Sequence, residues 1–63
     1  MKKYVLYKDF SGYKLTSPEN YNAHIQDTNK IVNIRECWTI SDAIRTVKYW
    51  MHLHDEQLII IGK

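Results

Sequence analysis

The alternation of apolar and polar side chains predicts that the chain begins with a β-hairpin. The residues of one set, Tyr4, Leu6 and Phe10, alternate with those of the other, Lys3, Val5, Tyr7 and Asp9. Ser11-Gly12 follows as a two-residue turn in which glycine can adopt a positive φ. Pairing across this turn places Phe10 opposite Tyr13 and brings most of the apolar side chains to one face.

A second alternating stretch predicts a second hairpin. Positions 21–26 alternate strictly, polar residues follow to position 30, and residues 31–38 then supply the second strand segment. A loop at Thr28-Asn29 would place Ile25 opposite Val32, so that apolar residues face apolar ones. The region also fits a short helix, because Ser17 can cap a helix and Pro18 suits the first helical position. The sequence alone leaves both interpretations open.

The segment after Trp38 predicts one amphipathic helix. Thr39 and Asp42 have the spacing of a capping box, which marks the start of a helix. Apolar residues then recur at intervals of three and four, and they form the stripe that should face the core: Ile40, Ala43, Ile44, Val47, Trp50 and Met51. We expect both tryptophans, Trp38 and Trp50, to be largely buried.

The final apolar run, residues 58–61, predicts a strand that is buried on both faces. The predicted fold is α+β in the order ββββαβ, with one helix across a small antiparallel sheet made of two hairpins and a C-terminal strand. Residues 1–63 are expected to form a single domain. One helix covers only one face of a sheet, so we expect a partner, or another segment of this chain, to cover the second face.

Composition narrows the classes of function. Nine Lys and Arg against seven Asp and Glu give a formal charge of +2. The sequence lacks the dense cationic clusters of a dedicated nucleic-acid-binding protein. No stretch approaches the roughly 20 apolar residues that span a membrane, and Lys8 and Asp9 interrupt the N-terminal apolar run too early for a signal peptide. We expect a cytoplasmic protein. Frequent Ile, Lys, Tyr and Asn, which have AT-rich codons, suggest a bacterial or phage origin.

No group of residues predicts catalysis, a cofactor or a metal site. His52, His54 and Asp55, with His24, resemble metal ligands, but on a helix the first two would point about 200° apart. Cys37 is the single cysteine, so no intrachain disulfide forms, and we expect it to be an inert, partly buried residue. The sequence therefore predicts a non-enzymatic protein without a cofactor or a small-molecule substrate.

Two classes of function remain, and each has its own candidate residues. The favoured class is a protein–protein interaction module, such as a regulator or inhibitor of a host macromolecule, that binds a protein partner or forms a homodimer. Its predicted partner-binding residues are Tyr49, Leu53, Ile59 and Ile61. The alternative is a nucleic-acid-binding protein that uses one helix flank and the outer sheet face, through Arg45, Lys48, His52, Tyr7, Lys14 and Arg35.

The order of the predicted elements resembles the small sheet-and-helix domains of antitoxins that neutralise RNA-cleaving toxins. The resemblance covers Lys2 to about Trp50 and rests on Lys-Tyr-Val at positions 3–5 and Thr-x-x-Asp-Ala at positions 39–43, motifs that also occur in unrelated α+β domains. The proline-rich loop of those domains is missing here, where residues 17–19 contribute a single proline. The resemblance implies a partner protein.

Overall fold

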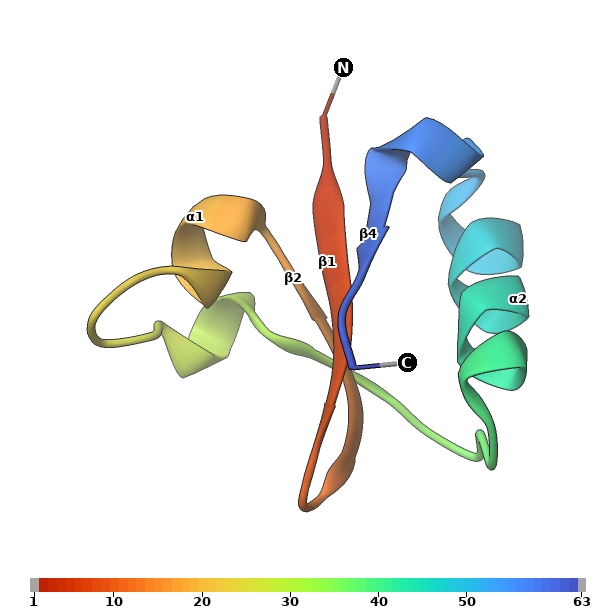
Figure 1. Ribbon diagram of the computed structural model, residues 1–63, viewed down its shortest axis with the longest axis horizontal. Helices are drawn as coiled ribbons and strands as arrows, with labels where there is room; N and C mark the ends of the chain where they lie inside the picture. Colours follow the sequence, from red (N-terminus) through yellow and green to blue (C-terminus); the bar gives the residue numbers. More distant parts are fainter. Residues whose placement is uncertain (1, 63) are drawn as a thin grey trace.

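The computed structural model describes residues 2–62 and has a four-stranded sheet with helices on both sides (Figure 1). The elements in chain order are β1 (Tyr4–Asp9), β2 (Gly12–Thr16), α1 (Pro18–Tyr21), η1 (Thr28–Lys30), β3 (Val32–Ile34), α2 (Ile40–Met51), η2 (Asp55–Gln57) and β4 (Leu58–Ile60). The strand order across the sheet is β3-β2-β1-β4. Neighbours are antiparallel except β1 and β4, which are parallel. The α+β class is thus confirmed, although the sheet is mixed.

The first hairpin forms with a different register from the predicted one. Asp9 pairs with Gly12, so the loop is Phe10-Ser11, and Phe10 projects fully into solvent instead of facing Tyr13. The Asp9 carboxylate causes this shift, because its Oδ1 accepts hydrogen bonds from the backbone N–H of Ser11 at 2.9 Å and from its hydroxyl at 2.8 Å. Gly12 then adopts a φ of +128°. A shift of two positions keeps every strand residue on its predicted face.

The predicted strand at residues 21–26 is wrong, and the short-helix interpretation holds instead. Ser17 caps α1 by accepting a hydrogen bond from the backbone N–H of Asn20 at 3.1 Å, and Pro18 occupies the first helical position. The chain then turns through an exposed loop in which Ile25 is 84% exposed. The second hairpin is therefore absent, and β3 pairs with β2 instead.

A buried polar cluster folds this segment over one face of the sheet. The Asn20 side chain donates hydrogen bonds to the Thr16 hydroxyl at 2.9 Å and to the Asp27 carbonyl at 3.0 Å, and it accepts one from the Asp27 backbone N–H at 2.8 Å. The Thr16 hydroxyl in turn donates to the Lys30 carbonyl. The hydrogen bonds of Asn20 thus hold the loop in place without strand pairing. Helix α1 covers the face of the sheet that carries Val5, and we call this face the outer face.

The predicted helix is confirmed, and it lies across the other face of the sheet. Thr39 caps α2, since its hydroxyl accepts the backbone N–H of Asp42 at 3.2 Å. Ala43 and Val47 are fully buried. The buried core between helix and sheet consists of Leu6, Tyr13, Leu15, Ile34, Ala43 and Val47. No helix among residues 2–62 has the length and apolar character needed to cross a membrane.

The expected burial of the two tryptophans is wrong. Trp38 is 90% exposed, because Cys37 takes the inward position in the loop before α2 and packs against the core. Trp50 is 64% exposed although it lies on the core stripe of the helix. It lies beside β3, which has three residues and forms an edge of the sheet, so no further strand covers it.

Candidate interaction surface

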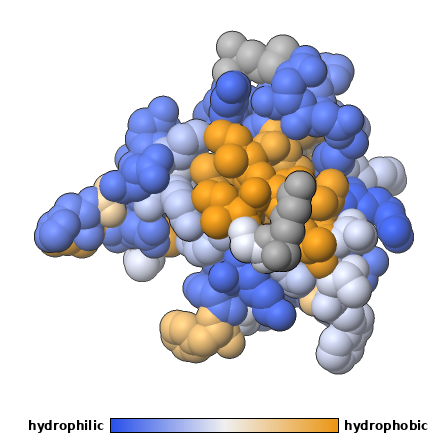
Figure 2. Space-filling view, in the orientation of Figure 1, coloured by the Kyte–Doolittle hydropathy of each residue, from blue (hydrophilic) through white to orange (hydrophobic). Residues whose placement is uncertain are grey.

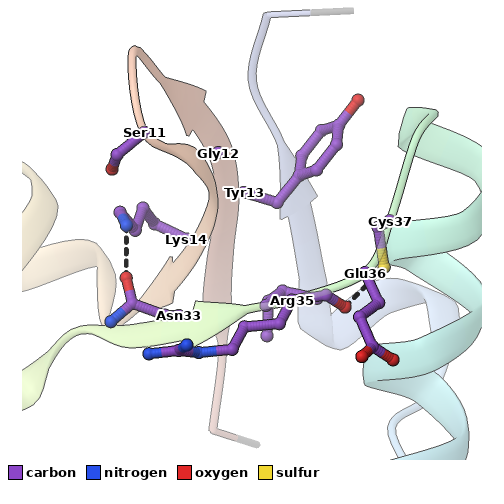
Figure 3. A pocket seen from close by; sticks show the side chains of 9 residues that line it. Ser11, Gly12, Tyr13, Lys14, Asn33, Arg35, Glu36 and Cys37 are labelled. Carbon is purple, nitrogen blue, oxygen red and sulfur yellow. Dashed lines mark hydrogen bonds between the residues drawn. The ribbon is translucent and has the colours of Figure 1, made fainter.

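A hollow lies between β2 and β3 and is lined by charged, polar and apolar residues (Figure 3). It measures about 580 Å³, and its lining residues are Ser11, Gly12, Tyr13, Lys14, Asn33, Ile34, Arg35, Glu36 and Cys37. The Lys14 ammonium donates a hydrogen bond to Asn33. The Cys37 sulfur lies 3.5 Å from the Arg35 carbonyl oxygen and 3.6 Å from the Thr46 hydroxyl. These contacts hold the thiol in place and offer it no general base.

The basic flank of α2, predicted as part of a nucleic-acid surface, is balanced by acidic neighbours. Arg45 lies 4.0 Å from the carboxylate of Asp42. Lys48 forms an ion pair with Asp55, and this contact lowers the pKa of the aspartate below its ordinary value. His52 lies at the end of the helix with a left-handed backbone. The flank therefore carries little uncompensated positive charge.

Two other residues of the nucleic-acid alternative, Tyr7 and Lys14, lie on the opposite side of the sheet, where they pair across β1 and β2 on the outer face. Arg35 follows β3 and lines a hollow together with Thr46 and Trp50 of α2. Tyr7 packs against Tyr21 with ring centroids 5.0 Å apart, and burial raises the pKa of its hydroxyl. Because the sheet separates Tyr7 and Lys14 from the flank of α2, the predicted residues do not form one continuous surface.

The four predicted partner-binding residues are also divided. Tyr49 is 81% exposed on α2, whereas Leu53 packs against the core. Ile59 lies on the outer face, where it pairs with Val5 in the neighbouring strand. Ile61 follows β4, and its backbone N–H donates to the Leu6 carbonyl at 3.0 Å. The structure thus keeps Tyr49 apart from the two isoleucines.

An apolar surface that the sequence pattern did not indicate lies where α2 meets β3. We call it the α2–β3 patch, and it consists of Val32, Trp50 and Met51. Val32 is 44% exposed and Met51 is 37% exposed, and the two line the same hollow. The available signal was the run Tyr49-Trp50-Met51. Consecutive helical residues point about 100° apart, so one helix cannot direct all three into the core.

A second apolar surface covers the free edge of β4. Figure 2 shows a hydrophobic area at the centre of the face on which β4 is nearest to the viewer in Figure 1. Ile59 is 38% exposed, and its neighbours Leu58, Ile60 and Ile61 are half-buried. We call residues 58–61 the β4 edge. It lies at the opposite end of the sheet from the α2–β3 patch.

The residues weighed as metal ligands do not meet. Within residues 2–62, no cluster of three or more His, Cys, Asp or Glu side chains is arranged to hold a metal ion. His24 lies in the exposed loop after α1, while His52 and His54 follow α2.

Comparison with protein-family models, with curated proteins and with solved structures finds no match to this chain. Its function is therefore argued from its own surfaces.

Proposed function

We propose that this chain is a small non-enzymatic protein-binding module that acts by occupying a partner protein through the α2–β3 patch. The observation that carries the proposal is the exposure of Trp50, 64%, on the helix stripe that should be buried. Tryptophan, tyrosine and methionine are enriched at the centres of protein interfaces. Here Trp50 and Met51 stand at the end of α2: Met51 shares a hollow with the exposed Val32, and Trp50 lines another hollow beside β3.

The fold supports binding rather than chemistry at this surface. The three patch residues stand on two elements that the core holds in place, since Ala43 and Val47 anchor α2 and Ile34 anchors β3. A rigid support lowers the entropy lost on binding. We propose further that the chain is a bacterial or phage regulator or inhibitor and that its partner is a host protein.

Nucleic-acid binding remains the alternative from a different class. Its most favourable feature is the tyrosine pair Tyr7 and Tyr21, because Lys14 lies opposite Tyr7 on the outer face. The charge of the helix flank counts against this alternative, because the carboxylates of Asp42 and Asp55 offset the positive charges of Arg45 and Lys48. The two classes differ in salt response, because phosphate-driven binding weakens steeply as salt rises and an apolar interface does not.

The test is capture from a bacterial lysate with an N-terminally tagged chain, after nuclease treatment and washing at high salt. We expect one protein to remain bound, and Trp50→Ala should weaken its binding about 30-fold, as the loss of a central interface residue does. Phe10→Ala is the matched control, because Phe10 is an even more exposed aromatic residue at the hairpin tip. Equal capture by both variants, or release of the partner by nuclease or salt, would refute the proposal.

A further inference from the structure

The β4 edge presents unpaired backbone groups beside apolar side chains. In a parallel pair, alternate residues direct their N–H and C=O toward the neighbouring strand. The Ile61 N–H donates to the Leu6 carbonyl at 3.0 Å, so Ile59 and Ile61 face β1 and the N–H and C=O of Ile60 point away from the sheet. β4 is the last strand in the order, and Figure 2 shows its surface open to the viewer.

Natural edge strands are usually protected against pairing by charged residues, proline or a bulge. The run Leu58-Ile59-Ile60-Ile61 has no charge and no proline, and it pairs with β1 in continuous register. The opposite edge differs, because Asn33 lies in β3 and Arg35 and Glu36 follow it. Both edge strands have three residues, and β4 is the one that consists of large aliphatic residues alone.

We propose that a second copy of this chain adds its β4 antiparallel to this edge, so that Ile59 faces Ile59 of the other copy across a twofold axis. This surface is separate from the α2–β3 patch, so the proposal goes beyond the function proposed above. The result is a dimer with one continuous eight-stranded sheet, which is four strands from each copy.

The register follows from the groups that are free to bond. The Leu58 N–H already donates to the Asp55 carbonyl, which leaves the Leu58 C=O and the Ile60 N–H available. With Ile59 on the axis, each Ile60 N–H meets the Leu58 carbonyl of the other copy. The two Ile59 side chains, each 38% exposed on the outer face, then cover one another.

A second copy fits this edge better than a foreign strand because the edge is self-complementary. With Ile59 on the axis, Leu58 faces Ile60 of the other copy and Ile59 faces Ile59, so antiparallel pairing sets an apolar residue against an apolar residue at each position of β4.

The first test is the mass of the chain in solution. Light scattering at tens of micromolar should give twice the 7.6 kDa chain mass. Ile59→Lys should halve that mass, because it places two like charges together on the axis. Val32→Lys is the matched control, since Val32 is a β-branched residue of similar exposure on the other edge strand, and it should leave the dimer intact. A monomeric wild-type chain at these concentrations would overturn the proposal.

The second test fixes the register and does not depend on a disruptive charge. Directly opposed residues of a non-hydrogen-bonded antiparallel pair have Cα atoms about 4.5 Å apart, within the range of about 4.4–6.8 Å that a disulfide spans. In a Cys37→Ser background, Ile59→Cys should therefore form a disulfide-linked dimer under mild oxidation, while Val32→Cys should stay monomeric on a denaturing gel. Equal cross-linking of the two variants would contradict the arrangement.

The two proposals fail separately. Ile59→Lys should still capture the partner protein, because the α2–β3 patch is unchanged, and Trp50→Ala should still form the dimer. Loss of capture with an intact dimer removes only the proposed function, and a monomer that retains capture removes only the dimer.

Discussion

At the scale of single residues, strain is concentrated at two positions where the chain leaves a regular element. Glu36, just beyond β3, has a φ of +62°, and His52, at the end of α2, has a φ of +54°. A left-handed backbone costs a residue with a side chain about 1–2 kcal/mol, which glycine avoids. The fold accepts this cost at His52 because the chain must reverse direction there to reach β4.

We predict that His52→Gly stabilises the protein. The expected gain in the free energy of unfolding is about 0.5–1 kcal/mol, because the relief of strain is partly offset by the greater freedom of glycine in the unfolded chain. Urea denaturation measures it. His54→Gly is the control, since His54 has an extended backbone with φ −84° and should lose stability. If His52→Gly lowered the free energy of unfolding as much as His54→Gly does, the prediction would be contradicted.

Asn20 should be the most sensitive polar residue in the protein. Asn20→Ala removes three hydrogen bonds to Thr16 and Asp27 and leaves buried polar groups without partners, so we expect a loss of about 2–3 kcal/mol. The neighbouring Asn22 is exposed, and Asn22→Ala should change stability little. Denaturation of the two variants in parallel decides the matter, and a similar effect of both would show that Asn20 does not hold the loop.

At the scale of elements, the first hairpin makes stability depend on pH. Hydrogen bonds from Ser11 lower the pKa of Asp9 below its ordinary value in the folded state. A carboxyl whose pKa is lowered by folding contributes stability above its unfolded pKa of about 3.9, and that contribution is lost as pH falls through the folded pKa. We predict that the free energy of unfolding, measured by urea denaturation, falls less between about pH 6 and about pH 3 for Asp9→Asn than for the wild type. An unchanged difference would rule out this role.

The elements that the sequence predicted correctly are those with local signals. The cap at Thr39, the helical spacing of apolar residues and the unbroken run at 58–61 each depend on neighbours in sequence, and the structure has α2 and β4 at those positions. The alternation at 21–26 failed because one distant contact, between the Asn20 side chain and the Asp27 backbone, replaces the strand pairing that alternation implies. The hairpin register shifted for a local reason that alternation does not reveal, because the Asp9 carboxylate accepts hydrogen bonds from Ser11 two residues later.

The candidate surfaces also differ in whether the sequence could predict them. Ile59 and Ile61 could be singled out from the sequence, because a run that is apolar on both faces exceeds what one helix covers. The α2–β3 patch could not, because it depends on the shortness of β3 and on its place at the edge of the sheet. The sequence likewise did not decide what covers the outer face, where the segment from Ser17 to Ile31 takes much of the place expected for a partner.

At the scale of the whole molecule, the protein has two apolar surfaces at opposite ends of one small sheet. The α2–β3 patch faces away from the β4 edge, so a chain paired through β4 presents two copies of the patch, one at each end of the dimer. Such a dimer would engage a repeated or symmetric partner with higher avidity than a single chain.

Dimerisation should also make thermal stability depend on concentration. Association stabilises the folded state by mass action, so the Tm of the wild-type chain should rise as protein concentration increases. Ile59→Lys should remove this dependence, and Trp50→Ala should keep it. Scanning calorimetry over a hundredfold range of concentration provides the measurement. A wild-type Tm that is constant over this range would contradict a dimer that forms as it folds.

The exchange rate of the Ile60 backbone amide tests the account most directly, because it requires no substitution. In the isolated chain this N–H points away from β1, whereas the Ile61 N–H donates to Leu6. If a second copy pairs with the edge, exchange at Ile60 slows as concentration rises, while Ile61 is protected at every concentration. Rapid exchange at Ile60 at all concentrations, beside a protected Ile61, would show that the β4 edge stays open and would contradict the dimer.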